Sequence, residues 1–223
     1  MSLGCVIELG TWLGKSATFF AGLCPNAIVF AVDLWDNDYL KTDLHYIQSG
    51  ENLAILNNHP IYDQFLVNAW DKRCKGLDTL DEPVNGIVPM KMDSCVAMQL
   101  LHDHNILPDI IYVDACHHYE GAYRDINTAV TLFPQAHIIG DDWDYEGVRT
   151  AAQTIARERG FGICAHSNKC WTFSKSIAQK GLKRKAEQER AETEARKKEE
   201  EYANGLKSMS FSQLLGSFKK TKK

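Results

Sequence analysis

The stretch Cys5-Val-Ile-Glu-Leu-Gly-Thr-Trp-Leu-Gly-Lys-Ser16 carries the strongest signal for the fold. Its apolar start predicts a short buried strand that ends near Glu8, followed by a turn from Gly10 to Gly14 and a helix over residues 15–23. Glycines in such a turn let a ligand approach the backbone, and the start of the helix presents unpaired N–H groups. The alternative is that these residues form only a tight turn between the strand and the helix and bind no ligand.

Two nucleotide-binding patterns fit this turn poorly. The phosphate-binding loop needs four residues between its glycine and Gly-Lys-Ser, whereas only three separate Gly10 from Gly14. The dinucleotide pattern Gly-x-Gly-x-x-Gly is absent as well. Glu8 would repel phosphates, so the pattern Glu-x-Gly-x-x-x-Gly favours a positively charged ligand. A nucleoside triphosphatase is the alternative, since Gly14-Lys15-Ser16 and the apolar strand before Asp114 resemble parts of its two motifs.

The size and composition are those of one well-buried domain with an appendage. The chain has 223 residues, of which 44% are hydrophobic and 24% charged. No run approaches the ~20 apolar residues of a membrane span, and the first residues lack the basic start of a signal peptide. The seven cysteines are an odd number without any Cys-x-x-Cys. We therefore expect a reduced, cytoplasmic protein rather than a disulfide scaffold or a structural zinc site.

The charges divide the chain into two parts. Residues 180–223 carry 13 Lys/Arg and 7 Glu, whereas residues 1–179 have a net charge of −10. This predicts a globular domain over 1–179 and a charged tail over 180–223, helical or partly disordered. The acidic domain argues against a nucleic-acid groove in it, while the basic tail could contact something anionic.

Further strands are predicted by continuous apolar runs, which are typical of parallel strands buried on both faces. They cover residues 27–33, 87–93, 108–114 and 136–140, and a closing β-hairpin is predicted from 161–165 and 170–173. Helices are predicted over about 40–57, 60–73, 94–104, 120–132 and 147–159. The alternation of strands and helices predicts an α/β fold with a doubly wound sheet.

Acidic residues stand at the ends of the predicted strands, where ligands bind in open parallel sheets. They are Glu8, Asp33, Asp93, Asp114, Asp141 and Asp142. Asp33 follows the glycine turn at the spacing of a ribose-binding acid, whereas Asp93 with Ser94 either caps a helix or contacts an adenine amino group. No Lys or Arg stands among these positions, which excludes a polyphosphate. The acids suit a sulfonium cofactor at strands one to three and a divalent metal at strands four and five.

These residues together resemble the class I S-adenosylmethionine (SAM)-dependent methyltransferases. The resemblance covers residues 5–175 and rests on the first turn, Asp33, Asp93-Ser94, the run from Ile110 to Gly121, and Ile138-Ile-Gly-Asp-Asp-Trp143 followed by Gly147-Val-Arg149. The Asp-x-x-His-x-Tyr-Glu and Gly-Asp-Asp-Trp motifs are similar to those of the small-molecule O-methyltransferase branch. The resemblance implies a Rossmann-like sheet of seven strands in the order 3-2-1-4-5-7-6, with strand 7 antiparallel.

The same resemblance implies the functions of individual residues. The cofactor SAM would contact Glu8, Gly10, Thr11, Gly14, Asp33, Trp35, Asp93, Ser94 and Asp114. Magnesium would be held by Asp114, Asp141 and Asp142, as in related sugar O-methyltransferases, where it orients a vicinal diol. His117 would be the general base, and Asp142 is named as a second catalytic residue. The acceptor would be an oxygen of a small polar, sugar-like molecule.

Two departures from the family pattern leave alternatives open. Cys116 stands where metal-dependent relatives carry a second acid, and the neighbouring His118 fits an exposed loop. The first strand begins at Cys5, without the helices that usually cover the acceptor. Either the sequence is a piece of a longer chain, or residues 34–86, the tail or a second subunit of a homo-oligomer covers the site. The alternative function is a catalytically degenerate SAM-binding scaffold whose charged tail binds a partner.

Overall fold

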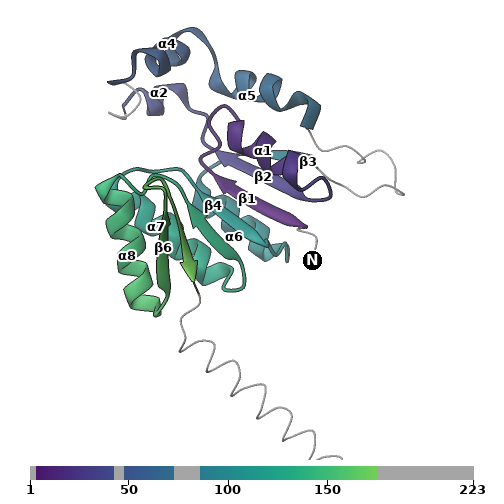
Figure 1. Ribbon diagram of the computed structural model, residues 1–223. Coiled ribbons are helices and arrows are strands. Elements are labelled where there is room, and N and C mark those ends of the chain that lie inside the picture. The colour runs from purple at the N-terminus through teal and green to yellow at the C-terminus, as the bar shows by residue number, and fades with distance from the viewer. Residues whose placement is uncertain (1–3, 43–47, 73–85, 175–223) are drawn as a thin grey trace, which may run out of the picture. The chain divides into compact units, whose positions relative to one another are not determined.

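A seven-stranded sheet forms the centre of the protein in the computed structural model, which describes residues 4–42, 48–72 and 86–174. Its strands are β1 (Cys5–Leu9), β2 (Ile28–Asp33), β3 (Gly86–Lys91), β4 (Ile110–Val113), β5 (His137–Gly140), β6 (Gly162–His166) and β7 (Cys170–Ser174). The order across the sheet is β3-β2-β1-β4-β5-β7-β6 (Figure 1). The predicted strand order is therefore confirmed.

The strand directions bring all the acidic strand ends to one edge. β1 pairs in parallel with β2 and β4, β2 with β3, and β4 with β5. β7 runs antiparallel to both β5 and β6, so the predicted antiparallel seventh strand and closing hairpin are confirmed. The order of the strands reverses between the neighbouring strands β1 and β4. Ligands bind at this point in sheets of this kind.

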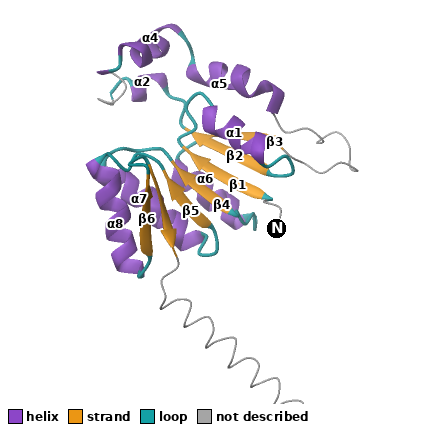
Figure 2. Ribbon diagram, viewed as in Figure 1, coloured by secondary structure: helices purple, strands orange, loops and turns teal. Residues whose placement is uncertain are grey.

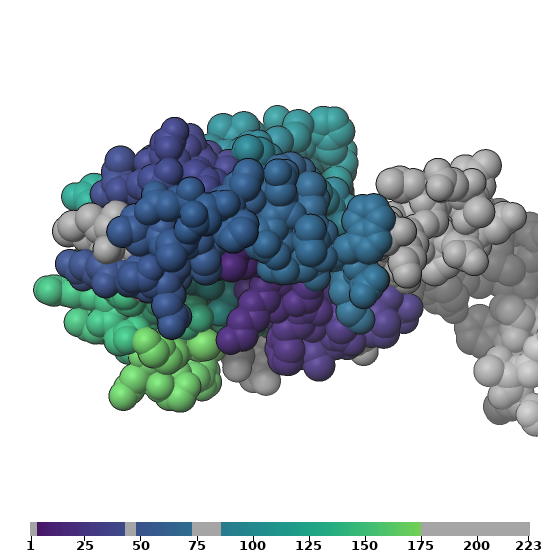
Figure 3. Space-filling model, turned by 90° about the horizontal axis from the view of Figure 1, so that it is seen from above, coloured from purple at the N-terminus to yellow at the C-terminus, as the bar shows by residue number. Residues whose placement is uncertain are grey.

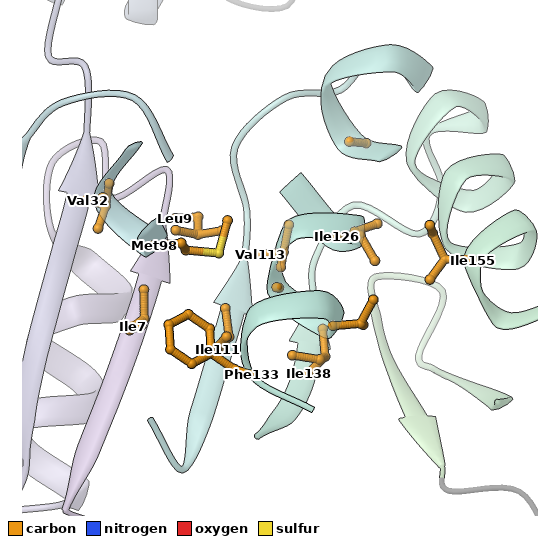
Figure 4. Packing of buried hydrophobic residues seen from close by; sticks show 14 of the residues in the cluster. Ile7, Leu9, Val32, Met98, Ile111, Val113, Ile126, Phe133, Ile138 and Ile155 are labelled. Carbon is orange, nitrogen blue, oxygen red and sulfur yellow. The ribbon is translucent and has the colours of Figure 1, made fainter. Parts of the chain in front are cut away.

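Helices cover both faces of the sheet (Figure 2). They are α1 (Lys15–Leu23), α2 (Asn37–Leu40), α4 (Gly50–Asn58), α5 (Ile61–Ala69), the 3-10 turn η1 (Trp70–Lys72), α6 (Ser94–Asp103), α7 (Tyr119–Leu132) and α8 (Glu146–Arg159). Because side chains alternate along a strand, neighbouring residues of β1 enter different cores. Val6 packs with α1, α4 and α5, whereas Ile7 packs with α6, α7 and α8 (Figure 4).

The segment after β2 differs from the prediction. A single helix over about 40–57 is wrong, because α2 ends at Leu40 and α4 starts at Gly50, capped by the Ser49 hydroxyl. Asp36 caps α2 in the same way and accepts from two backbone N–H groups. Side-chain caps of this kind start a new helix where periodicity alone suggests one continuous helix. Seen from above, the segment from α2 to α5 (blue) forms much of the visible surface (Figure 3).

Two further expectations can be placed against the described residues. The boundary between a domain over 1–179 and a tail over 180–223 lies outside them. Within the described part of the chain, no helix is both long enough and apolar enough to cross a membrane.

Candidate functional site

The turn after β1 is fixed against the ends of two neighbouring strands. Gly10 has a φ of +84°, and its N–H donates to the Val32 carbonyl at 2.8 Å. A Cβ at Gly10 would lie 1.9 Å from the Asp114 carbonyl oxygen at the end of β4. Glycine is therefore required here by a close contact between backbones as well as by the left-handed conformation. This contact places the turn beside the reversal of strand order.

Asp33, at the end of β2, faces the same turn. One carboxylate oxygen accepts from the Trp12 N–H at 2.8 Å and the other from the Trp35 N–H at 2.7 Å. Burial raises the pKa of Asp33, and these N–H groups oppose the rise. Each oxygen has a second lone pair, so Asp33 can still accept hydrogen bonds from two adjacent hydroxyls.

Glu8 is completely buried, and neither of its carboxylate oxygens has a hydrogen-bond partner among the described residues. Burial raises the pKa of Glu8 to about 7, although the nearby Ser16 and Thr11 hydroxyls lower it and Asp33 raises it further. An unsatisfied buried carboxylate is costly. A ligand that brings a positive charge or N–H donors to this turn would remove that cost.

A pocket lies beside this turn, at the carboxyl ends of β1 to β4. It encloses about 650 Å³ including its open mouth. Its lining consists of Gly10, Asp33, Leu34, Tyr39, Leu40, Asp93, Ser94, Asp114, Ala115, Cys116, Arg124 and Asp125. Helix α2 thus contributes part of the wall.

A histidine–carboxylate pair lies next to the pocket-lining residues that directly follow β4. His117 Nε2 is 3.0 Å from Asp142 Oδ2, and both side chains are largely buried. The loop that carries His117 packs closely against the start of α8, because a Cβ at Gly147 would lie 2.4 Å from the His117 carbonyl oxygen. Asp142 adopts a φ of +59°, a left-handed conformation that Asp tolerates better than most residues. The structure thus brings together the two residues that the sequence names as catalytic.

The family model "Methyltransferase domain" matches residues 7–143, which include the turn, the pocket lining and the His117–Asp142 pair. This match covers more than half of the chain. The chain belongs to this methyltransferase family. No curated protein matches it at the level of sequence.

Solved structures with a similar fold include other methyltransferases. A calicheamicin methyltransferase is 13% identical with a TM-score of 0.49, the match covering 76% of this chain and 72% of that one. Fibrillarin from a fibrillarin–Nop5p complex is 13% identical with a TM-score of 0.47, covering 79% and 74%. A precorrin 8w decarboxylase from Methanobacterium thermoautotrophicum is 13% identical with a TM-score of 0.47, covering 79% and 83%.

Membership of the methyltransferase family implies SAM as the methyl donor, and the residues fit it. Of the expected cofactor contacts, Gly10, Asp33, Asp93, Ser94 and Asp114 line the pocket. Glu8 lies behind the turn, with its unsatisfied carboxylate suited to a cationic group. The acidic wall suits a ligand with a sulfonium and an ammonium group better than one with phosphates.

Three of the residues expected to contact the cofactor also make contacts within the protein. Trp35 is buried in the core, where its ring lies 4.4 Å from that of Phe65 and its indole N–H donates to the Trp12 carbonyl. Thr11 is also buried, and Gly14 starts α1 against Phe65. None of the three lines the pocket. The chain turns inward directly after β2, so Trp35 packs in the core, and its contact with the cofactor stays a prediction.

The three carboxylates expected to bind magnesium, those of Asp114, Asp141 and Asp142, do not form a metal site among the described residues. No group of three or more His, Cys, Asp or Glu side chains in the described part of the chain is arranged to hold a metal. Asp141 accepts from the Tyr112 hydroxyl at 2.9 Å and from the Asp142 N–H at 2.9 Å. Asp142 is directed to His117. These contacts engage the carboxylates of Asp141 and Asp142 within the protein, and no step through a metal is derived.

Asp114 is held close to these acids without an opposite charge. Burial raises its pKa, and the charges of Asp142, Asp141 and Glu8 act in the same direction, bringing it to about 9. Asp114 therefore binds a proton more readily than an ordinary carboxyl group. The rim of the pocket is less negative than the count of carboxylates suggests.

The sequence interpretation missed Arg124 and Asp125, which reach the pocket from α7. Arg124 pairs with Asp93 at 2.9 Å, so one of the rim acids has a basic partner. Asp125 is 1% exposed, and burial raises its pKa to about 6 while Arg124 lowers it. A signal was present, because Asp125 stands at an inward position of the stripe formed by Ala122, Ile126 and Ala129. A charged residue in such a stripe indicates a buried polar partner or a site.

Proposed function

We propose that the protein transfers the methyl group of SAM to an oxygen of a small polar acceptor. The observation that carries this proposal is the position of the His117–Asp142 pair beside the acidic pocket at the reversal of strand order. A hydroxyl is a weak nucleophile, so an oxygen acceptor needs a base to remove its proton. A neutral amine or a thiolate needs no such base. A buried His–Asp pair supplies that base.

The proposed mechanism uses residues on both sides of the pocket. Asp33 would hold the ribose hydroxyls of the cofactor, and Glu8 would face its positively charged end. When bound, SAM supplies an electrophilic methyl group on a sulfonium. Displacement of that methyl by the acceptor oxygen needs the two reacting atoms in line, so positioning supplies much of the rate.

His117 would take the acceptor proton in this mechanism. In the neutral ring Nε2–H donates to Asp142 Oδ2, so the second proton enters at Nδ1 and Asp142 stabilises the resulting imidazolium. Nδ1 is buried, so the proposal requires the loop that carries His117 to shift when the acceptor binds.

Cofactor binding is tested by calorimetry with SAM and with its product S-adenosylhomocysteine (SAH). We expect micromolar affinity, about −8 kcal/mol. Asp33→Ala should weaken it by roughly tenfold or more, since it removes charged hydrogen-bond acceptors from the pocket. Equal binding by wild type and variant would contradict the assignment of Asp33.

Methyl transfer is tested with a panel of glycosides and catechols. His117→Gln should lower kcat by about 10² to 10⁴ and leave the affinity for SAH unchanged, because His117 does not line the cofactor pocket. His118→Gln is the matched control, since the neighbouring His118 is exposed. A His117→Gln variant with wild-type kcat would show that this histidine is not the base.

A further inference from the structure

The turn between β1 and α1 contains a residue in a strained backbone conformation, Trp12. Its φ is +51°, a left-handed conformation that is an outlier for a bulky side chain. Trp35, the second residue after β2, is left-handed as well, with a φ of +43°. Conformations of this kind persist only where the surrounding structure holds them, and they cluster at ligand sites. The contacts that hold these two residues therefore bear on how the turn binds a ligand.

The two tryptophans are joined to each other by three hydrogen bonds. Asp33 accepts from the Trp12 N–H with Oδ2 at 2.8 Å and from the Trp35 N–H with Oδ1 at 2.7 Å. The indole N–H of Trp35 in turn donates to the Trp12 carbonyl at 2.7 Å. The backbone of Trp12 is thus bound at its N–H by Asp33 and at its carbonyl by Trp35.

Helix α5 supports the next residue of the turn. The side-chain amide of Asn68 donates from Nδ2 to the Leu13 carbonyl at 2.9 Å. Gln64, one helical turn earlier, donates to Asn68 Oδ1 at 2.9 Å and so orients this amide. Phe65 packs below the same turn, because a Cβ at Gly14 would lie 2.9 Å from its ring. Helix α5 therefore contacts the turn through a hydrogen bond and a packed ring.

The supports of the two neighbouring carbonyls are packed against each other. The Trp35 ring lies 4.4 Å from that of Phe65 and 4.9 Å from that of Tyr62, both on α5. Trp35 is 2% exposed, so its indole has little room to leave the carbonyl that it binds. The segment that connects β2 to α5 thus acts as one unit on the turn, from outside the pocket.

We propose that Trp35 and Asn68 are positioning residues that hold the turn after β1 in the conformation that binds the cofactor. Neither residue lines the pocket, so each acts through the backbone carbonyl that it binds, that of Trp12 or of Leu13. Without these hydrogen bonds the strained turn populates other conformations. The apparent affinity for the cofactor then falls in proportion to the fraction that stays competent. This inference rests on the proposed binding of SAM beside the turn.

Calorimetry of the full chain with SAH tests the support from α5. Asn68→Ala should raise the dissociation constant about three- to tenfold, the effect of one lost hydrogen bond. Asn58→Ala is the matched control, because Asn58 is also exposed and near the end of a helix. Its amide donates to the Ala54 carbonyl within α4 and not to the turn, so its dissociation constant should equal that of wild type. An unchanged constant in Asn68→Ala would overturn the role of Asn68.

The support from Trp35 is tested by Trp35→Phe, which keeps an aromatic ring against Phe65 but removes the indole N–H. The dissociation constant for SAH should rise by at least about threefold. Trp171→Phe is the control, since Trp171 is a buried tryptophan whose indole N–H donates to the Asp141 carbonyl, outside the pocket lining. It should lower the unfolding temperature but leave the affinity for SAH unchanged. An equal loss of affinity in both variants would assign the effect to lost stability and overturn the role of Trp35.

The left-handed conformation of Trp12 supplies a readout that lost stability alone would not change. Asparagine adopts this conformation more readily than tryptophan. In a Trp12→Asn background the fold change caused by Trp35→Phe should therefore be at most about half of that in wild type. Equal fold changes in the two backgrounds would show that Trp35 does not hold the strained residue.

The outcomes separate this inference from the proposed function. If Trp35→Phe does not fold, the comparison of Asn68→Ala with Asn58→Ala decides the inference. Tight binding of SAH by wild type and by both Trp35→Phe and Asn68→Ala would refute the inference alone. Absence of SAH binding by wild type would refute the proposed function itself.

Discussion

At the scale of single residues, Glu8 is the group whose surroundings most directly predict a measurable property. It is a buried carboxylate without a hydrogen-bond partner among the described residues, and burial raises its pKa from 4.5 to about 7. Between these two values the folded protein keeps a proton that the unfolded chain has lost. Stability therefore falls as the pH rises through this window and is lowest above about pH 7.

Glu8→Gln should abolish this contribution to the pH dependence. The free energy of unfolding of wild type, relative to the variant, should fall by about 3 kcal/mol between pH 4.5 and pH 7.5. Urea unfolding of both proteins at the two pH values measures the difference. Asp114 also makes the free energy of unfolding fall as the pH rises. Its effect largely cancels in the difference between wild type and Glu8→Gln, because both proteins contain Asp114. A difference that does not change with pH would mean that Glu8 does not titrate in this range.

At the scale of elements, the connection from β1 to α1 depends on one backbone contact. Gly10→Ala would add a Cβ 1.9 Å from the Asp114 carbonyl oxygen at a φ of +84°. We expect a loss of at least about 2 kcal/mol from strain and overpacking, together with weaker SAH binding because the pocket wall shifts. Thermal unfolding and calorimetry measure the two effects.

Gly22→Ala is the control for that change within the same strand–helix unit. Gly22 lies in α1, and a Cβ there would meet nothing within 4 Å. Alanine in a helix is favoured over glycine by about 0.5–1 kcal/mol, so this variant should be slightly more stable than wild type. If both variants lost stability equally, the contact between Gly10 and β4 would not be the cause.

At the scale of the whole molecule, residues 1–174 form a compact unit by themselves. A chain shortened to residues 1–179 should therefore keep the unfolding temperature of the full chain. SAH at 100 times its dissociation constant should stabilise both proteins by about 2.7 kcal/mol, which raises Tm by roughly 5–10 °C. Differential scanning calorimetry makes the comparison. A Tm shift that disappears on truncation would indicate that residues 180–223 contribute to cofactor binding.

The sequence by itself determined the sheet and the elements around the first turn. Continuous apolar runs ending in Glu8, Asp33 and Asp114 predicted parallel strands, and these strands form in the predicted order. The hairpin of β6 and β7 was predicted from its two apolar runs in the same way. Such features are local, because burial on both faces fixes the composition of a strand wherever it lies in the sheet.

Only the tertiary structure decided which side chains meet at the edge of the sheet. It brought Arg124 and Asp125 to the pocket, because the apolar stripe of α7 determines which side faces the core, whereas the packing of α7 in the fold determines which strand ends its residues reach. It buried Trp35 against Phe65 and directed Asp142 to His117 instead of to a shared metal position. The physical reason is that strand ends fix where backbones lie, whereas side-chain contacts between distant segments depend on loop conformations that no local pattern encodes.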